Sequence, residues 1–249
     1  ILPWSDQGIR ALVLREGNAQ LVETPRSGVM ENRREITARL RLASDGHFRC
    51  DGEIHAWGGM AESFREELWM LNEAGRKEYL SSWFALRAPG TRLERYHFEG
   101  LDPPSDPLVI SFSLESEETI PAVGDLFFLD PSAIQLLLPE FFYDETSESP
   151  FEVVFPWHET QKIEILLPPD FQIDTFPAPV EVITPFAEFR QGITGGAQII
   201  RFTQSFSMKQ IVIPEDLQAS LREFAVAFER ARRVLFTLKR HAEKGVASF

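Results

Sequence analysis

The chain has 249 residues, of which 43% are hydrophobic and 25% are charged, and 21 are phenylalanine. This length allows one large domain or two medium ones and can bury a large core without disulfides. We expect two domains with an aromatic-rich interior. With 25 basic and 38 acidic side chains the net charge is −13, which repels nucleic-acid phosphates and argues against a nucleic-acid partner. The longest apolar stretches, 134–138 and 234–236, are far shorter than the roughly 20 residues of a spanning helix, so we expect no membrane insertion.

The first 34 residues predict two short strands. The apolar run at 11–14 predicts a buried strand, and a second short strand is expected at about 19–23, after a turn at 16–18. Thr24-Pro25 ends it because proline restricts the residue before it.

The next segments predict a β-hairpin followed by two helices. Apolar side chains alternate with polar ones over 36–42 and again over 48–54, and the intervening Ser44-Asp45-Gly46 is a turn sequence. After Gly58-Gly59 apolar residues recur at helical spacing, and a second helix is expected near 77–86. These helices form an insertion near 60–87.

The middle of the chain predicts further strands. Alternation at 93–98 and 108–114 flanks a proline-rich loop at 102–107, so these two strands can pair across it. Another strand is expected at 126–129, the apolar patch 134–138 is ambiguous between helix and strand, and the acidic, polar run 144–150 is interpreted as a linker or loop tip.

The last hundred residues predict strands closed by a helix. Strands are expected at 152–155, 161–167, 187–190 and 197–208, with short extended segments between the four prolines of 162–184 and a turn at 192–196. Pro214, followed by two acids, predicts a helix start, and the helix should reach about residue 233. Residues 234–238 either extend it or form a closing strand.

Together the patterns predict a mainly β fold with some α structure (α+β), built from antiparallel β-sandwich-like domains. The helical insertion lies near 60–87 and the C-terminal helix near 214–235. The expected division is a connecting segment at 1–34, a β-rich domain with the helical insertion at 35–148, and a β-sandwich-like domain with the C-terminal helix at 149–249.

The single thiol, Cys50, is the first candidate for chemistry. It rules out an internal disulfide and is compatible with cytosol or periplasm. A thiol nucleophile needs a histidine that makes it a thiolate, but Cys50 shares its strand parity with Phe48 and Ile54. We therefore expect it to lie in the core as a small apolar residue.

The opposite face of the same strand carries residue types that bind metals. Alternate residues of one strand can converge on an ion, although an arginine among them opposes a cation and a solvated polar face also explains the set. The members are His47, Arg49, Asp51, Glu53 and His55. The remaining histidines, His97, His158 and His241, lie on separate elements, so spacing assembles no histidine cluster.

Two acidic groups are candidate calcium ligands or a general acid/base pair, and solvated charge is the simpler interpretation. They comprise Glu115, Glu117 and Glu118, and Glu140, Asp144, Glu145 and Glu148. The glycine-rich run 192–196 lacks the lysine and hydroxyl of a phosphate-binding loop, and no Gly-x-Ser-x-Gly sequence occurs. We therefore assign no catalytic, cofactor-binding or metal-binding residue and expect no cofactor.

Aromatic side chains offer a binding alternative. Exposed rings stack on sugars or fill a partner's pocket, and the candidates are Trp57, Trp157, Phe141 and Phe142. In so phenylalanine-rich a chain, core packing is the favoured role.

Short motifs in a fixed order resemble one known arrangement. They are Leu2-Pro3 with Gly8, Ala11-Leu12-Val13, Thr24-Pro25, Asn32, Asp45-Gly46, Arg65, Tyr79, Gly124-Asp125-Leu126, Leu167-Pro168, Pro177-Ala178-Pro179 and the final helix. In this order the chain resembles the C-terminal accessory region of bacterial transglutaminase-like proteins, in which domains of unknown function follow the catalytic core.

The resemblance implies that a papain-like transglutaminase or peptidase core, with its Cys, His and Asp, lies upstream of residue 1, and that 1–34 ends that domain. None of the triad has a counterpart here, so the segment is expected to be inert by itself. The resemblance also implies a periplasmic or cell-surface location.

The functional expectation is therefore a non-catalytic accessory region that packs beside the upstream transglutaminase-like domain and shapes substrate access. The alternative is a peptide- or glycan-binding β-sandwich module, and a third is an independent hydrolase.

Overall fold

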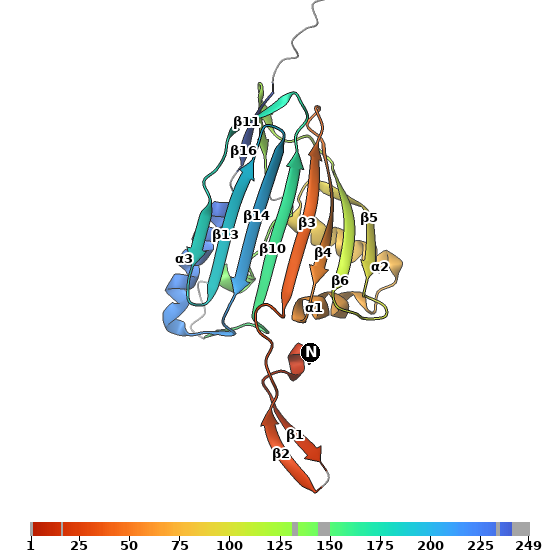
Figure 1. Ribbon diagram of the computed structural model, residues 1–249, viewed down its shortest axis with the longest axis vertical. Helices are drawn as coiled ribbons and strands as arrows, with labels where there is room; N and C mark the ends of the chain where they lie inside the picture. The colour runs from red at the N-terminus through yellow and green to blue at the C-terminus, as the bar shows by residue number, and fades with distance from the viewer. Residues whose placement is uncertain (1, 16, 131–133, 144–149, 233–234, 241–249) are drawn as a thin grey trace, which may run out of the picture.

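The computed structural model describes residues 2–15, 17–130, 134–143, 150–232 and 235–240. An eight-stranded sheet dominates it, with strand order β12-β13-β14-β10-β3-β4-β6-β5 (Figure 1). These strands are β3 (Arg33–Leu42), β4 (Phe48–Ala56), β5 (Thr91–Glu99), β6 (Leu108–Ser116), β10 (Trp157–Leu166), β12 (Val180–Ile183), β13 (Ala187–Gly195) and β14 (Ile199–Met208).

All neighbours in this sheet are antiparallel except β3 and β10, which pair in parallel. A parallel pair needs a long crossover, and here the chain between β3 and β10 includes β4, β5 and β6 of the same sheet. The mainly β, α+β, sandwich-like prediction is confirmed. The boundary predicted at 148/149 lies outside the described residues, and the sheet joins strands from both sides of it.

The helices are α1 (Gly59–Leu68), α2 (Glu73–Arg87) and α3 (Gln218–Arg232). The insertion predicted near 60–87 and the helix predicted near 214–235 are therefore confirmed, with the latter preceded by the 3-10 turn Glu215–Leu217. Two further 3-10 turns are η1 (Trp4–Asp6) and η2 (Glu140–Tyr143).

A second layer covers one face of the large sheet. Phe84 of α2 packs against Phe112 of β6, and Phe228 of α3 packs against Phe189 of β13, with ring centroids 4.8 Å apart in both cases. A four-stranded sheet, β11-β16-β8-β7, adds its apolar side chains to the same core. Its strands are β7 (Ala122–Val123), β8 (Leu126–Leu129), β11 (Phe171–Thr175) and β16 (Phe236–Arg240).

The other face of the large sheet is open to solvent (Figure 1). On β3, for example, Ile36, Leu40 and Leu42 are buried while Thr37 and Arg39 are exposed. Such a two-sided sheet gives the strict alternation from which the strands were predicted.

The predicted 36–54 hairpin is confirmed, since Ile36 pairs with Ile54 and Leu40 with Cys50. Strands β5 and β6 pair across the proline-rich loop as expected. The prediction of a strand at 152–155 is wrong in extent, because β9 covers only Phe151–Glu152 and pairs with β15 (Val212–Ile213). The turn predicted at 192–196 is also misplaced, because β13 continues to Gly195 and pairs through it with β14.

Candidate functional site

The N-terminal hairpin stands apart from the body of the molecule (Figure 1). The two predicted strands are present as β1 (Arg10–Arg15) and β2 (Asn18–Glu23), which pair with each other. The burial predicted for 11–14 is wrong, because Leu12 and Leu14 are exposed to solvent. A two-stranded hairpin alone is marginally stable in water, so one that projects from a fold has reason to pack on something else.

One face of this hairpin carries large apolar side chains in solvent. Leu12 pairs with Leu21 and Leu14 with Ala19, so these four residues share a face. The leucines are 60% (Leu12), 73% (Leu14) and 59% (Leu21) exposed. We call this surface the leucine face. Contiguous exposed apolar side chains of this kind typically mark an interaction surface.

The base of the hairpin is fixed to the body by buried hydrogen bonds. Asn32, which is fully buried, donates to Ser27 Oγ at 2.8 Å and to the Pro156 carbonyl at 2.9 Å. Its own Oδ1 accepts from the Gly59 amide at the start of α1. Ser27 in turn donates to Gln7 Oε1 from its amide and its hydroxyl, at 2.7 and 2.8 Å.

A second attachment holds the segment before the hairpin. The Trp4 amide donates to Glu62 Oε2 and its indole N–H to Glu66 Oε1, each at 3.1 Å, so η1 is held on α1. Gly8 and Thr24 close the hairpin's base through the bond from the Gly8 amide to the Thr24 carbonyl at 3.1 Å. The leucine face is therefore presented on an anchored stem.

Cys50 lies in the core, as predicted. Its side chain is fully buried, and burial raises the pKa of the thiol to about 12, with the neighbouring Asp51 charge adding to the shift. A thiol with so high a pKa supplies almost no thiolate at neutral pH.

The polar face of β4 forms ion pairs. Asp51 accepts from Arg41 at 2.7 Å and from Arg49 at 3.2 Å, and His55 Nε2 lies 2.9 Å from Glu53. Burial raises the pKa of Asp51, but the hydrogen bonds from Ser113, Arg49 and Arg41 together bring it below its usual value. Among the described residues no group of three His, Cys, Asp or Glu side chains is placed to hold a metal ion.

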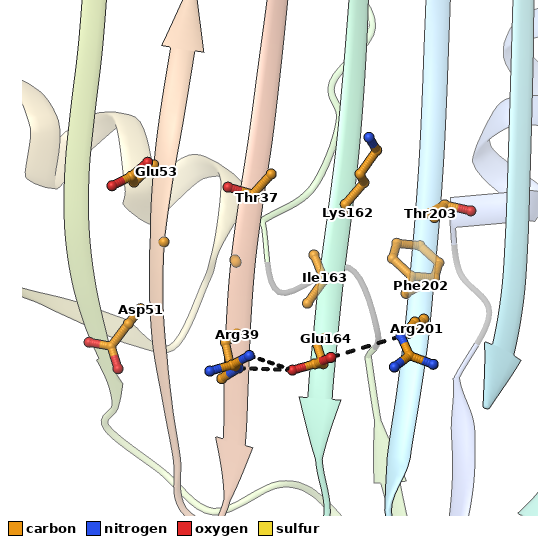
Figure 2. Close-up of a pocket in the computed structure, with 12 residues that line it drawn as sticks. Thr37, Arg39, Asp51, Glu53, Lys162, Ile163, Glu164, Arg201, Phe202 and Thr203 are labelled. Atoms are coloured by element: carbon orange, nitrogen blue, oxygen red, sulfur yellow. Dashed lines mark hydrogen bonds and ion pairs between the residues drawn. The ribbon is translucent and has the colours of Figure 1, made fainter. Parts of the chain in front are cut away.

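A shallow hollow of about 470 Å³ lies on the open face beside these pairs (Figure 2). Arg39 bonds Glu164 at 2.9 Å, Arg201 approaches the same carboxylate at 3.8 Å, and Lys162 lies across Thr37 from Glu53. Phe202, the only ring among the described residues of its lining, is 1% exposed and belongs to the core. These residues thus provide no aromatic platform on which a sugar could stack.

The aromatic candidates for binding divide between core and surface. Trp157 and Phe142 belong to the buried cluster around α3, which confirms core packing for them. Trp57 is partly buried beneath Arg33, whose guanidinium carbon lies 3.7 Å from the ring centroid. The side chain of Phe141 lies outside what the structure describes. These positions give little support to the peptide- or glycan-binding alternative.

The structure brings together two side chains, His158 and Ser207, that the sequence patterns did not connect. His158 Nδ1 lies 2.7 Å from Ser207 Oγ across β10 and β14. Burial lowers the pKa of His158, against the charges of Glu159, Glu35 and Glu188. Ser207 sits on an interior strand paired on both sides, so its neighbouring amides serve the sheet and not an oxyanion. The pair has the surroundings of a structural contact.

The acidic candidates are solvated where they are described. Glu115, Glu117 and Glu118 are exposed, and Glu115 approaches Arg92 at 3.6 Å. The side chain of Glu140 and residues 144–149, which include Asp144, Glu145 and Glu148, lie outside the described residues, as does His241.

No helix in the described part of the chain is long and apolar enough to cross a membrane.

Comparison with known proteins gives one match. Residues 126–234, less than half of the chain, match the family model described as a domain of unknown function with a solved structure, DUF3858. The matched span begins at β8 and includes α3, and the family that it resembles is uncharacterised. No curated protein and no solved structure matches the chain.

Proposed function

We propose that this chain is a non-catalytic accessory region whose N-terminal hairpin packs against a neighbouring folded domain. The sequence resemblance makes a transglutaminase-like core of the same polypeptide the proposed neighbour. The observation that carries the proposal is the exposed leucine face on a stem fixed by Asn32.

The energetics favour docking of this face. Burying one leucine side chain stabilises a structure by about 1.5–3 kcal/mol relative to leaving it in water. Leu12, Leu14 and Leu21 are adjacent on one face, so a partner surface can cover all of them together. Because the stem is already ordered by hydrogen bonds, docking requires little further ordering of the chain.

The non-catalytic part of the proposal is supported by the state of the reactive groups. The thiol of Cys50 is buried with a raised pKa, and the described histidines and acids considered above are in ion pairs, in sheet contacts or in solvent. The role proposed for the region is to brace the core beside which it packs and to shape access to it.

The test compares charge substitutions in two contexts, the 249-residue chain and a longer natural polypeptide that includes what precedes it. Leu12→Asp should leave the thermal stability of the 249-residue chain nearly unchanged, because this side chain is already in solvent. In the longer polypeptide it should lower the stability of the preceding domain and expose the hairpin to protease. Val226→Asp, at a 52% exposed position on α3, is the matched control.

Two results would count against the proposal. If the preceding sequence encodes no domain with a transglutaminase-like Cys, His and Asp core, the neighbour is wrongly identified. If Leu12→Asp and Val226→Asp have equal effects in the longer polypeptide, the leucine face is not the contact surface.

A further inference from the structure

A second hollow lies between α1, α2, the 137–139 segment, the 152–155 segment and β10, with Trp4 also in its lining. Its volume is about 760 Å³. The walls are largely apolar and include Met60, Leu86, Leu138, Val153, Phe155 and Trp157. A concave apolar surface with a few placed polar groups is the usual form of a small-ligand site.

One ion pair lies in the lining of this hollow. Arg34 of β3 donates to Glu159 Oε2 of β10 at 3.1 Å from Nε and 2.5 Å from Nη2, and the Trp157 indole donates to the other oxygen at 3.2 Å. The two charged side chains are only 12% and 8% exposed. Both charges are thereby compensated within the protein.

Arg87 lines the same hollow and forms no ion pair with a described residue, although the charge of Glu159 acts on it. Its guanidinium carbon lies 4.1 Å from the centroid of the Trp83 ring, and Nη1 makes a weak 3.4 Å bond to the Trp83 carbonyl. No carboxylate of a described residue lies within ion-pair distance of it. Burial, and the charge of Arg34, lower the pKa of Arg87 to about 10, and this guanidinium remains cationic at neutral pH.

The opposite charges of Arg34 and Glu159 cancel. Of these three side chains, Arg87 therefore leaves one net positive charge beneath the apolar walls. Glu66, Glu67 and Glu152 also line the hollow, but each is exposed to solvent, where its field is screened. These acids disfavour a ligand with several negative charges. A single negative charge on an apolar body fits both the walls and Arg87.

We propose that this hollow binds an apolar group that ends in a carboxylate, with the carboxylate on Arg87 and the apolar body against Leu138, Val153 and Phe155. A free aliphatic carboxylate and the C-terminus of an apolar peptide share this chemistry. Arg87 orients the ligand, and no covalent step is involved.

The test is a titration of the 249-residue chain followed by tryptophan fluorescence, since Trp4 and Trp157 line the hollow and Trp83 lies under Arg87. The probes are dodecanoate, dodecanol, and a short leucine-rich peptide with either a free or an amidated C-terminus. A free carboxylate should bind at least about tenfold more tightly than its uncharged counterpart. Whichever carboxylate binds more tightly, dodecanoate or the free peptide C-terminus, identifies the chemical source of the ligand.

Arg87→Met keeps an apolar stem over Trp83 and should weaken carboxylate binding by about tenfold or more. Arg76→Met is the matched control, because Arg76 is on the same helix, bonds a backbone carbonyl at 3.2 Å and does not line this hollow. It should leave binding unchanged. Ser63→Phe narrows the hollow without changing its charge and should weaken both kinds of probe. Circular dichroism confirms that each variant folds.

The proposal is overturned if carboxylates and their uncharged counterparts bind equally, if Arg87→Met binds as tightly as the unaltered chain, or if no probe binds at millimolar concentration.

Discussion

The Arg34–Glu159 pair offers the sharpest test of how the sheet is stabilised. Removing one partner of a buried ion pair leaves a desolvated charge, which costs about 3–5 kcal/mol. Glu159→Ala does this to Arg34 and also removes the acceptor of the Trp157 indole. Since a folded domain is stable by only about 5–15 kcal/mol, the variant should lose a large part of its stability.

A second glutamate of the same strand provides the control. Glu164 points to the open face, where it bonds Arg39, whose side chain is 54% exposed. A solvated pair of this kind contributes about 0.2–1 kcal/mol, so Glu164→Ala should be nearly neutral. Replacing both Arg34 and Glu159 by methionine should cost less than Glu159→Ala, because no charge is then left buried without its partner.

Urea unfolding at pH 7, followed by far-ultraviolet circular dichroism, measures all of these variants. The reasoning is refuted if Glu159→Ala costs no more than Glu164→Ala, or if the double methionine variant is destabilised by the sum of its two single substitutions.

Three further predictions concern single positions. Gly52→Ala should destabilise the protein by about 1–3 kcal/mol, because the added Cβ would lie 2.5 Å from the Thr37 carbonyl oxygen and 2.6 Å from the Phe112 ring. Gly192→Ala, whose Cβ would have its nearest atom at 3.2 Å, should cost clearly less in the same urea assay, and equal costs would contradict the steric argument. Burial lowers the pKa of His158 in the folded state, so the unfolded chain binds more protons and the free energy of unfolding should fall as the pH drops below about 6.5. His158→Asn should make the free energy of unfolding depend less on pH between about pH 7.5 and 5.5, and an equal pH dependence in both proteins would disprove the role of His158. Cys50, fully buried and with its pKa raised to about 12, should react with a thiol reagent only after urea unfolds the chain, and rapid labelling of the native protein would show that the thiol is accessible.

Local patterns predicted the hairpins and helices because each depends on residues close in sequence. The β3–β4 register follows from alternation on both sides of Asp45-Gly46, and the hairpin at the N-terminus follows from two apolar runs around Gly17. The burial of Cys50 could be predicted for the same reason, since strand parity alone places it on the inward face.

The first four residues of β10 were missed because polar side chains interrupt its apolar pattern. Glu159 and Gln161 point inward like Trp157 and Ile163, but they are polar, so Trp157 stands apart from the apolar residues that follow. The partner that makes burial of Glu159 tolerable, Arg34, lies 125 residues away in the sequence.

Contacts between residues far apart in sequence also limited how much of the site could be predicted from the sequence. Nothing in the local sequence indicates that β3 and β10 are parallel neighbours or that His158 meets Ser207. The leucine face was recognisable as a pair of apolar strands, but only the fold shows that those strands project away from the core. Sequence patterns describe which residues are apolar and not what covers them.

Hydrogen exchange of the β1 and β2 backbone amides tests the central claim most directly. In the 249-residue chain, the hairpin amides should exchange much faster than those of β3, because the hairpin stands apart from the body formed by the described residues. In the longer polypeptide the same amides should exchange at least about tenfold more slowly, as docking of the leucine face stabilises the strand pair. Equal exchange in the two proteins would contradict the proposal that this hairpin packs against a neighbouring domain.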